Sequence, residues 1–146
     1  MGRLAKLADL PPAERQLLVC GWAEVLVMRA AIWMFPYARV RRIVQRRALR
    51  RFGADRQRPA PNRIAWAVGA ASGLVPGGRN CLVRALATET MLGRYGYPGE
   101  LRFGVEKDAA GGIRAHAWLE SGGRPIIGDF ELDRYATMTA PRGDAH

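Results

Sequence analysis

The segment Arg79-Asn80-Cys81-Leu82-Val83-Arg84-Ala85-Leu86-Ala87 places a cysteine directly after an asparagine, at the start of an apolar-periodic run. Asparagine is a favoured N-cap residue, so the pattern predicts a helix that begins at Asn80 or Cys81 and ends near residues 95–96. The free N–H groups of a first helical turn favour a thiolate and could supply part of an oxyanion hole. A lone cysteine beside apolar residues is more often a small buried side chain, so Cys81 alone does not indicate chemistry.

The hydrophobic period changes from helical to alternating after Pro98. Leu101, Phe103 and Val105 alternate with polar or small residues and predict a first strand. A Gly-rich turn at 108–112, a strand over 113–120, a second turn at 121–123 and a strand over 124–129 complete the pattern. The expected fold class is therefore α+β, with helices followed by an antiparallel β-meander.

Two further residues could act together with Cys81. His116 lies in the second predicted strand and shares its face with Trp118, which suits a shielded imidazole. Asp129 ends the third predicted strand, where its carboxylate could orient a histidine ring. Separately, His116 could be structural and Asp129 could cap a turn. Together, in the order Cys, His, Asp, they match what a thiol nucleophile needs: a proton shuttle and a group that orients it.

The first half of the chain is predicted to be helical. One helix follows Pro11-Pro12 and ends at Phe35-Pro36, and a second, arginine-rich helix spans 37–52, with Gly53 as its stop. Asn62 is expected to cap a short helix that precedes the Cys81 segment. The predicted organisation is a helical lobe for substrate or partner docking over 1–53, a linker over 54–61, a catalytic core over 62–136 and a flexible tail over 137–146.

Composition narrows the function classes. The 146 residues are enough for one domain, and 23 basic minus 13 acidic residues leave a net charge of +10. This charge favours an anionic peptide, a membrane surface or nucleic acid, but no base-stacking or reading motif supports nucleic acid. With only two histidines and no cysteine pair at ligand spacing, a zinc site is not expected. Two isolated cysteines favour a reducing cytoplasm over a disulfide-stapled secreted domain.

The apolar stretch from Leu17 to Phe35 is interrupted by Glu24 and Arg29. Charges at these positions oppose a membrane span and favour a buried core helix. A helix that lies on a membrane surface, next to the arginine-rich segment, remains an alternative. The arginines themselves could be a solvated helix face or a docking surface.

Several blocks of this chain resemble one family. They are Asn80-Cys-Leu-Val-Arg-Ala-Leu-Ala87, Phe103-Gly-Val105, Gly112-Ile-Arg-Ala-His-Ala-Trp-Leu-Glu120 and Gly123-Arg-Pro-Ile-Ile-Gly-Asp129, together with Leu10-Pro-Pro-Ala-Glu-Arg-Gln-Leu-Leu18. These blocks resemble the transglutaminase-like peptidases of lasso-peptide biosynthesis, and more narrowly the stand-alone peptidase half of the split B protein. The resemblance covers nearly the whole chain, and the His-Ala-Trp block is its most specific part.

The resemblance implies a papain- or transglutaminase-like core and cytoplasmic removal of the leader from a ribosomally made precursor peptide. It makes Cys81 the nucleophile, His116 the general acid and base, and Asp129 the orienting group. It implies a separate leader-binding protein in trans and an ATP-dependent lasso cyclase as partners. No metal or other cofactor is expected. Trp118, Asn80 and Arg79 are expected to contact the substrate, the last two as part of the oxyanion hole.

Two rival functions remain open at this stage. An acyltransferase could use the same three residues, because related folds carry both hydrolysis and transfer. A basic scaffold without catalysis, which binds the leader or a membrane, would not need Cys81 at all.

Overall fold

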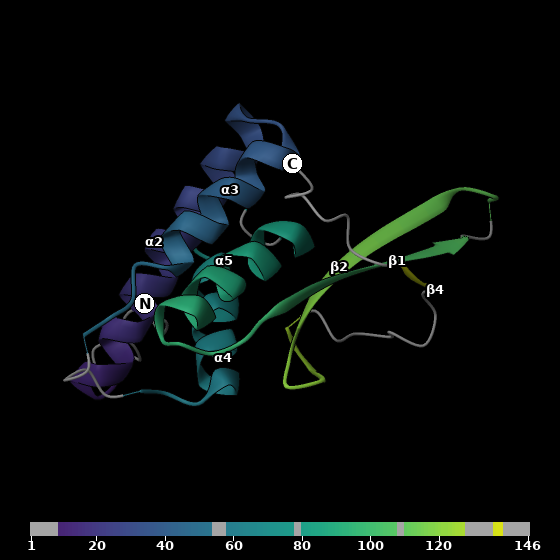
Figure 1. Ribbon diagram of the computed structural model, residues 1–146. Coiled ribbons are helices and arrows are strands. Elements are labelled where there is room, and N and C mark those ends of the chain that lie inside the picture. Colours follow the sequence, from purple (N-terminus) through teal and green to yellow (C-terminus); the bar gives the residue numbers. More distant parts are fainter. Residues whose placement is uncertain (1–8, 54–57, 78–79, 108–109, 128–135, 139–146) are drawn as a thin grey trace.

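The computed structural model describes residues 9–53, 58–77, 80–107, 110–127 and 136–138. Within them the chain forms the helices α2 (Pro12–Met34), α3 (Tyr37–Ala48), α4 (Pro61–Ser72) and α5 (Cys81–Arg94). The strands β1 (Glu100–Lys107), β2 (Ile113–Ser121), β3 (Arg124–Ile127) and β4 (Ala136–Met138) follow. Figure 1 shows the helices gathered on one side and the long β1–β2 hairpin extending away from them. The predicted α+β class is confirmed.

Proline and tertiary contacts set several helix ends. α4 begins at Pro61 with Ala60 as its N-cap, so the prediction that Asn62 caps it is wrong. Proline suits the first helical position because its φ is already helical and its missing N–H would have no partner there. α3 ends at Ala48, before the predicted residue 52. Here the chain leaves the helix, and the backbone N–H of Phe52 donates to the carbonyl of Arg94 at 2.8 Å.

The sheet has the strand order β3-β2-β1-β4, and all three pairings are antiparallel. The predicted meander of β1, β2 and β3 is confirmed. β4 was not predicted: Thr137 and Met138, assigned to the tail, pair with Gly104 and Phe103 of β1. Three residues are too few for an alternating pattern to show, and their pairing depends on a strand more than 30 residues earlier. Residues 139–146 and the predicted end of the third strand at Asp129 lie outside the described residues.

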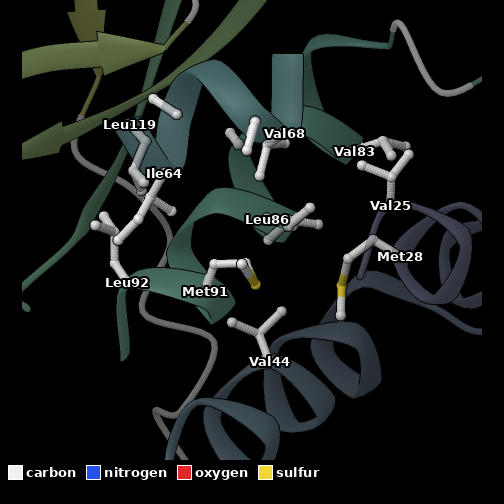
Figure 2. Close-up of a cluster of buried hydrophobic side chains, with 14 of the residues drawn as sticks. Val25, Met28, Val44, Ile64, Val68, Val83, Leu86, Met91, Leu92 and Leu119 are labelled. Carbon is white, nitrogen blue, oxygen red and sulfur yellow. The ribbon is translucent and has the colours of Figure 1, made fainter. Parts of the chain in front are cut away.

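One hydrophobic core joins the elements. Figure 2 shows side chains from all four helices and from β2 converging on it. Its fully buried members include Val25 and Met28 of α2, Val44 of α3, Ile64 and Val68 of α4, Val83, Leu86, Met91 and Leu92 of α5, and Leu119 of β2. Because α2 and α3 contribute to the same core as α5 and β2, the helical half directly supports the element that begins at Cys81.

A buried carboxylate ties three helices together. Glu24 of α2 is only 1% exposed and accepts hydrogen bonds from Nε and Nη2 of Arg47, at 2.9 and 2.8 Å. Arg94 of α5 donates to the same carboxylate at 3.3 Å. A buried charge is tolerated only with such partners. The hydrogen bond to Glu24 raises the pKa of Arg47 above its ordinary value, although partial burial opposes the shift.

The arginines of α3 therefore divide into two groups. Arg47 binds Glu24, and Arg41 forms a two-pronged ion pair with Glu89 of α5. Arg42 and Arg46 are exposed. The sequence left a solvated face and a docking surface as alternatives, and the structure adds a third role, in which two arginines neutralise carboxylates on neighbouring helices.

Candidate active site

Cys81 is the first residue of α5, as predicted, and its side chain is half-buried against the core. The side-chain oxygen of Asn80 accepts the backbone N–H groups of Leu82 at 2.9 Å and Val83 at 3.3 Å. Asn80 is thus the N-cap of α5, which confirms the prediction. A capped first turn is the position at which a helix stabilises a thiolate best.

The loop before Cys81 is held by a contact that the sequence did not reveal. Gly77 has a positive φ of 74°, and its carbonyl accepts the backbone N–H of Asn80 at 3.4 Å. The guanidinium of Arg29 from α2 occupies the space that a side chain on Gly77 would need. The only signal in the sequence is that Arg29 is one of two charged residues in the apolar stretch from Leu17 to Phe35, and a pattern cannot tell which loop such a residue contacts.

α5 and β2 pack against each other, and their chains run in the same direction. Leu92 of α5 and Leu119 of β2 both approach Gly99, and both elements run from right to left in Figure 1. From that shared contact, Cys81 lies eleven residues back along a helix, or about 16 Å. His116 lies three residues back along a strand, or about 10 Å. Each candidate therefore precedes the shared contact along its own element.

His116 occupies the middle of β2, where it pairs with Gly104 of β1. Its ring stacks on Trp118 with centroids 6.1 Å apart and an interplanar angle of 22°, which confirms the predicted shared face. Because strand side chains alternate, this face is opposite to the one that carries the buried Ala117 and Leu119. Among the described residues no hydrogen bond joins Cys81 to His116. Direct proton transfer between them stays a prediction.

Trp118 is the buried neighbour on which the His116 ring stacks. It is only 3% exposed and lies outside the main core cluster, and its indole N–H donates to the Glu120 carboxylate at 2.9 Å. Glu120 in turn lies 3.7 Å from the Arg102 guanidinium. Because Trp118 has so little exposed surface, it is better suited to hold the plane of the His116 imidazole than to contact substrate. The predicted contact between Trp118 and substrate stays a prediction.

The remaining predicted site residues are Asn80, Arg79 and Asp129. Asn80 is exposed, and the oxygen of its amide is used by the cap. Arg79 and Asp129 lie outside the described residues, so their predicted roles stay predictions. Among the residues that the structure describes, no group of three or more His, Cys, Asp or Glu is placed to hold a metal ion.

A family comparison matches this architecture. The model of the transglutaminase-like superfamily matches residues 22–140, more than four fifths of the 146-residue chain. The chain belongs to the transglutaminase-like superfamily. This superfamily generally contains cysteine peptidases and acyltransferases. Searches of curated proteins and of solved structures found no match.

The extent of the transglutaminase-like match bears on the organisation of the chain. It begins at Trp22, inside α2, and includes Cys81, His116 and Asp129. The match therefore crosses the predicted 54–61 linker, and most of the helical half lies within the family region. The shared hydrophobic core likewise joins α2 and α3 to α5 and β2. Whether residues 1–53 also serve as a docking lobe stays a prediction.

Proposed function

We propose that this protein is a cysteine peptidase that removes the leader from a lasso-peptide precursor by cleaving the leader–core junction. The observation that carries the proposal is Cys81 at the capped start of α5, on a helix that packs against the histidine-bearing strand of a transglutaminase-like chain. The choice of substrate rests on the blocks around Cys81, His116 and Asp129 that resemble the lasso-peptide peptidases.

The chemistry requires one nucleophile and one proton shuttle. The Cys81 thiolate attacks the carbonyl carbon of the junction peptide bond, and the first-turn N–H groups of α5 stabilise the oxyanion that forms. His116, as imidazolium, gives its proton to the departing amine, and the carbon–nitrogen bond breaks. His116 then takes a proton from water, which attacks the thioester. The leader leaves with a new carboxylate, and Cys81 is regenerated.

Asp129 orients His116 in this proposal by accepting a hydrogen bond from the second ring nitrogen. Trp118 supports the orientation from its place beside the ring, where it is itself held by Glu120. Arg79 and Asn80 complete the surroundings of the nucleophile. None of these steps routes through a metal or a nucleotide.

The partners in this proposal are the precursor, a separate leader-binding protein in trans and the ATP-dependent lasso cyclase that closes the ring afterwards. The setting is the cytoplasm. A net charge of +10 would attract an acidic leader or an acidic carrier protein. The exposed arginines of α3, such as Arg42 and Arg46, are candidates for that attraction.

An acyltransferase remains the second candidate, because the superfamily holds both activities. The first half-reaction would be the same, and an amine would then replace water as the acceptor of the acyl group. A covalent conjugate between the leader and an added amine would identify transfer, whereas two unmodified fragments would identify hydrolysis.

The decisive experiment is mass spectrometry of a leader–core peptide incubated with this protein and its leader-binding partner. We expect cleavage at one bond, lost by more than about 1,000-fold in Cys81→Ala. Cys20→Ala is the matched control, because Cys20 is the other half-buried free cysteine. Cleavage that survives Cys81→Ala, or is lost equally in Cys20→Ala, would contradict the proposal.

A second measurement tests whether Cys81 and His116 act together. The rate of Cys81 alkylation by iodoacetamide should rise with pH along a curve that His116→Ala displaces, because a nearby imidazolium favours the thiolate. The same displacement in Asp129→Ala would support its orienting role. A curve identical in wild type and His116→Ala would show that the two residues do not act together.

A further inference from the structure

The outward side of α2 is apolar over four turns. Every exposed residue of this helix from Val19 to Met34 is apolar: Val19, Trp22, Ala23, Leu26, Ala30, Trp33 and Met34. At 100° per residue these positions fall within an arc of about 120° and span about 22 Å. We call them the α2 apolar face. The opposite arc carries Leu17, Val25 and Met28, which are buried in the core.

α2 is thus apolar on both sides: one side is buried in the core, as predicted for this stretch, and the other is exposed. It is the one described helix long and apolar enough to cross a membrane, with a mean hydropathy of 1.7, but only 39% of that apolar window is buried. Trp33 is 79% exposed and Met34 62%. Monomeric proteins seldom leave such a contiguous surface in water, so the α2 apolar face needs a cover.

A groove widens the face toward α4. It has a volume of about 390 Å³ and is lined by Leu18, Val19 and Trp22 of α2, by Ala70 and Ala71 of α4, and by Leu74 and Arg15. Arg15 thus marks one end of the face. At the other end, Arg39 lies 5.5 Å from the ring of Phe35, which directly follows α2. Both arginines are exposed.

No exposed carboxylate opposes this positive charge along α2. Glu24 is buried between Arg47 and Arg94, and Glu14 forms an ion pair with Arg63. An apolar strip with two tryptophans, flanked by arginines and free of unpaired acids, has the composition of a surface that inserts at a lipid headgroup boundary. A net charge of +10 complements anionic lipid and opposes the pairing of two copies of this chain.

We propose that the α2 apolar face binds the surface of an anionic lipid membrane, with α2 parallel to the bilayer. Trp22, Leu26 and Trp33 insert at the headgroup boundary, and Arg15 and Arg39 bind lipid phosphates. The helix lies on the membrane and does not cross it, because Glu24 at its middle holds it to α3 and α5. This binding site is independent of the peptidase proposal, since no residue of it belongs to the candidate active site.

The test is co-sedimentation of the full chain with vesicles of equal parts POPC and POPG, beside vesicles of POPC alone. We expect binding to the anionic vesicles that weakens as salt rises. Trp33→Ser should lower the partition coefficient about tenfold. Arg15→Gln and Arg39→Gln should each lower it about fivefold. These residues are exposed, so the thermal midpoint of each variant should stay near that of the wild type.

Ile113→Ser is the matched control, because Ile113 is 73% exposed but lies at the start of β2, outside the face. Absence of binding to anionic vesicles, equal binding to POPC alone, or equal loss in Ile113→Ser would overturn the proposal. Light scattering gives a further check: a dimer that Trp33→Ser converts to a monomer would show that a second copy covers the face. Quantitative binding of the leader-binding protein to this face, in place of vesicles, would also overturn it.

Discussion

The two ends of α5 are held in different ways. At its C-terminal end, Arg94 donates to the carbonyl of Arg50 at 2.9 Å, reaches the buried Glu24 and covers the ring of Phe52 at 4.0 Å. Gly93 lets α3 approach so closely that a side chain there would overlap Ala48. At its N-terminal end, α5 is held by the Asn80 cap and by the Arg29 contact with the preceding loop.

This difference separates stability from chemistry on one helix. The C-terminal end joins α2, α3 and α5 through ion pairs to the buried Glu24 carboxylate, while the N-terminal end keeps its first-turn N–H groups beside a half-buried thiol. Variants at the C-terminal end should therefore cost stability, and variants at the N-terminal end should change reactivity more than stability.

The largest stability effect is expected for Arg47→Met. The change leaves the buried Glu24 with Arg94 alone, and removing one partner of a buried ion pair costs about 3 kcal/mol. Urea denaturation measures the loss. Arg46→Met, at an exposed neighbouring position of α3, should change stability by less than about 0.5 kcal/mol. If both variants lose the same free energy, the Glu24 network does not anchor α5.

Gly77→Ala tests the loop that leads to Cys81. Alanine at a φ of 74° is strained, and its Cβ would overlap the Arg29 guanidinium, so we expect a loss of about 2 kcal/mol. Removing the overlap with a second change, Arg29→Ala, should recover part of this loss in a double-mutant cycle. Strictly additive losses would mean that Arg29 does not hold the loop.

Asn80→Ala should cost about 1 kcal/mol, the usual value of an N-cap side chain. We expect the alkylation rate of Cys81 to fall as well, because the first turn of α5 frays. Asn80→Asp keeps an acceptor for the N–H groups of Leu82 and Val83 and should restore stability. A loss of stability without any change in Cys81 alkylation would separate the cap from the reactivity of the thiol.

The smallest effect is expected for Tyr37→Phe, between the two ends of α5. The Tyr37 hydroxyl is buried without a hydrogen-bond partner among the described residues, so its removal should be neutral or slightly stabilising at pH 7. Burial raises the pKa of Tyr37 above its ordinary value of 10.0, while the charge of Arg41 lowers it and that of Glu89 raises it.

A raised pKa in the folded state means that the unfolded chain releases this proton first as pH rises. Ionisation of Tyr37 therefore does not affect the free energy of unfolding below about pH 10, and it lowers this free energy as pH rises through the folded-state pKa of Tyr37. Thermal midpoints measured between pH 9 and 11 should fall less steeply in Tyr37→Phe than in wild type. Identical slopes would contradict the burial of this hydroxyl.

Local patterns were sufficient for the elements that carry the site. The Asn80 cap, the start of α5 at Cys81 and the β1–β2–β3 meander depend on neighbours in sequence, so a cap residue and an alternating period predict them. The predicted start of α4 was wrong, because Pro61 occupies the first helical position and Asn62, the predicted N-cap, lies inside the helix. β4 was missed because its only partner is distant in sequence.

The sequence by itself determined the α+β class, the helix that begins at Cys81, and the shared face of His116 and Trp118, because each depends on spacing along one element. Only the tertiary structure decided which arginines neutralise Glu24 and Glu89, which loop Arg29 contacts, and which side of α2 stays exposed. Those outcomes depend on which elements pack together. A helix that is apolar all round has the same sequence pattern whether it is covered on one side or on both.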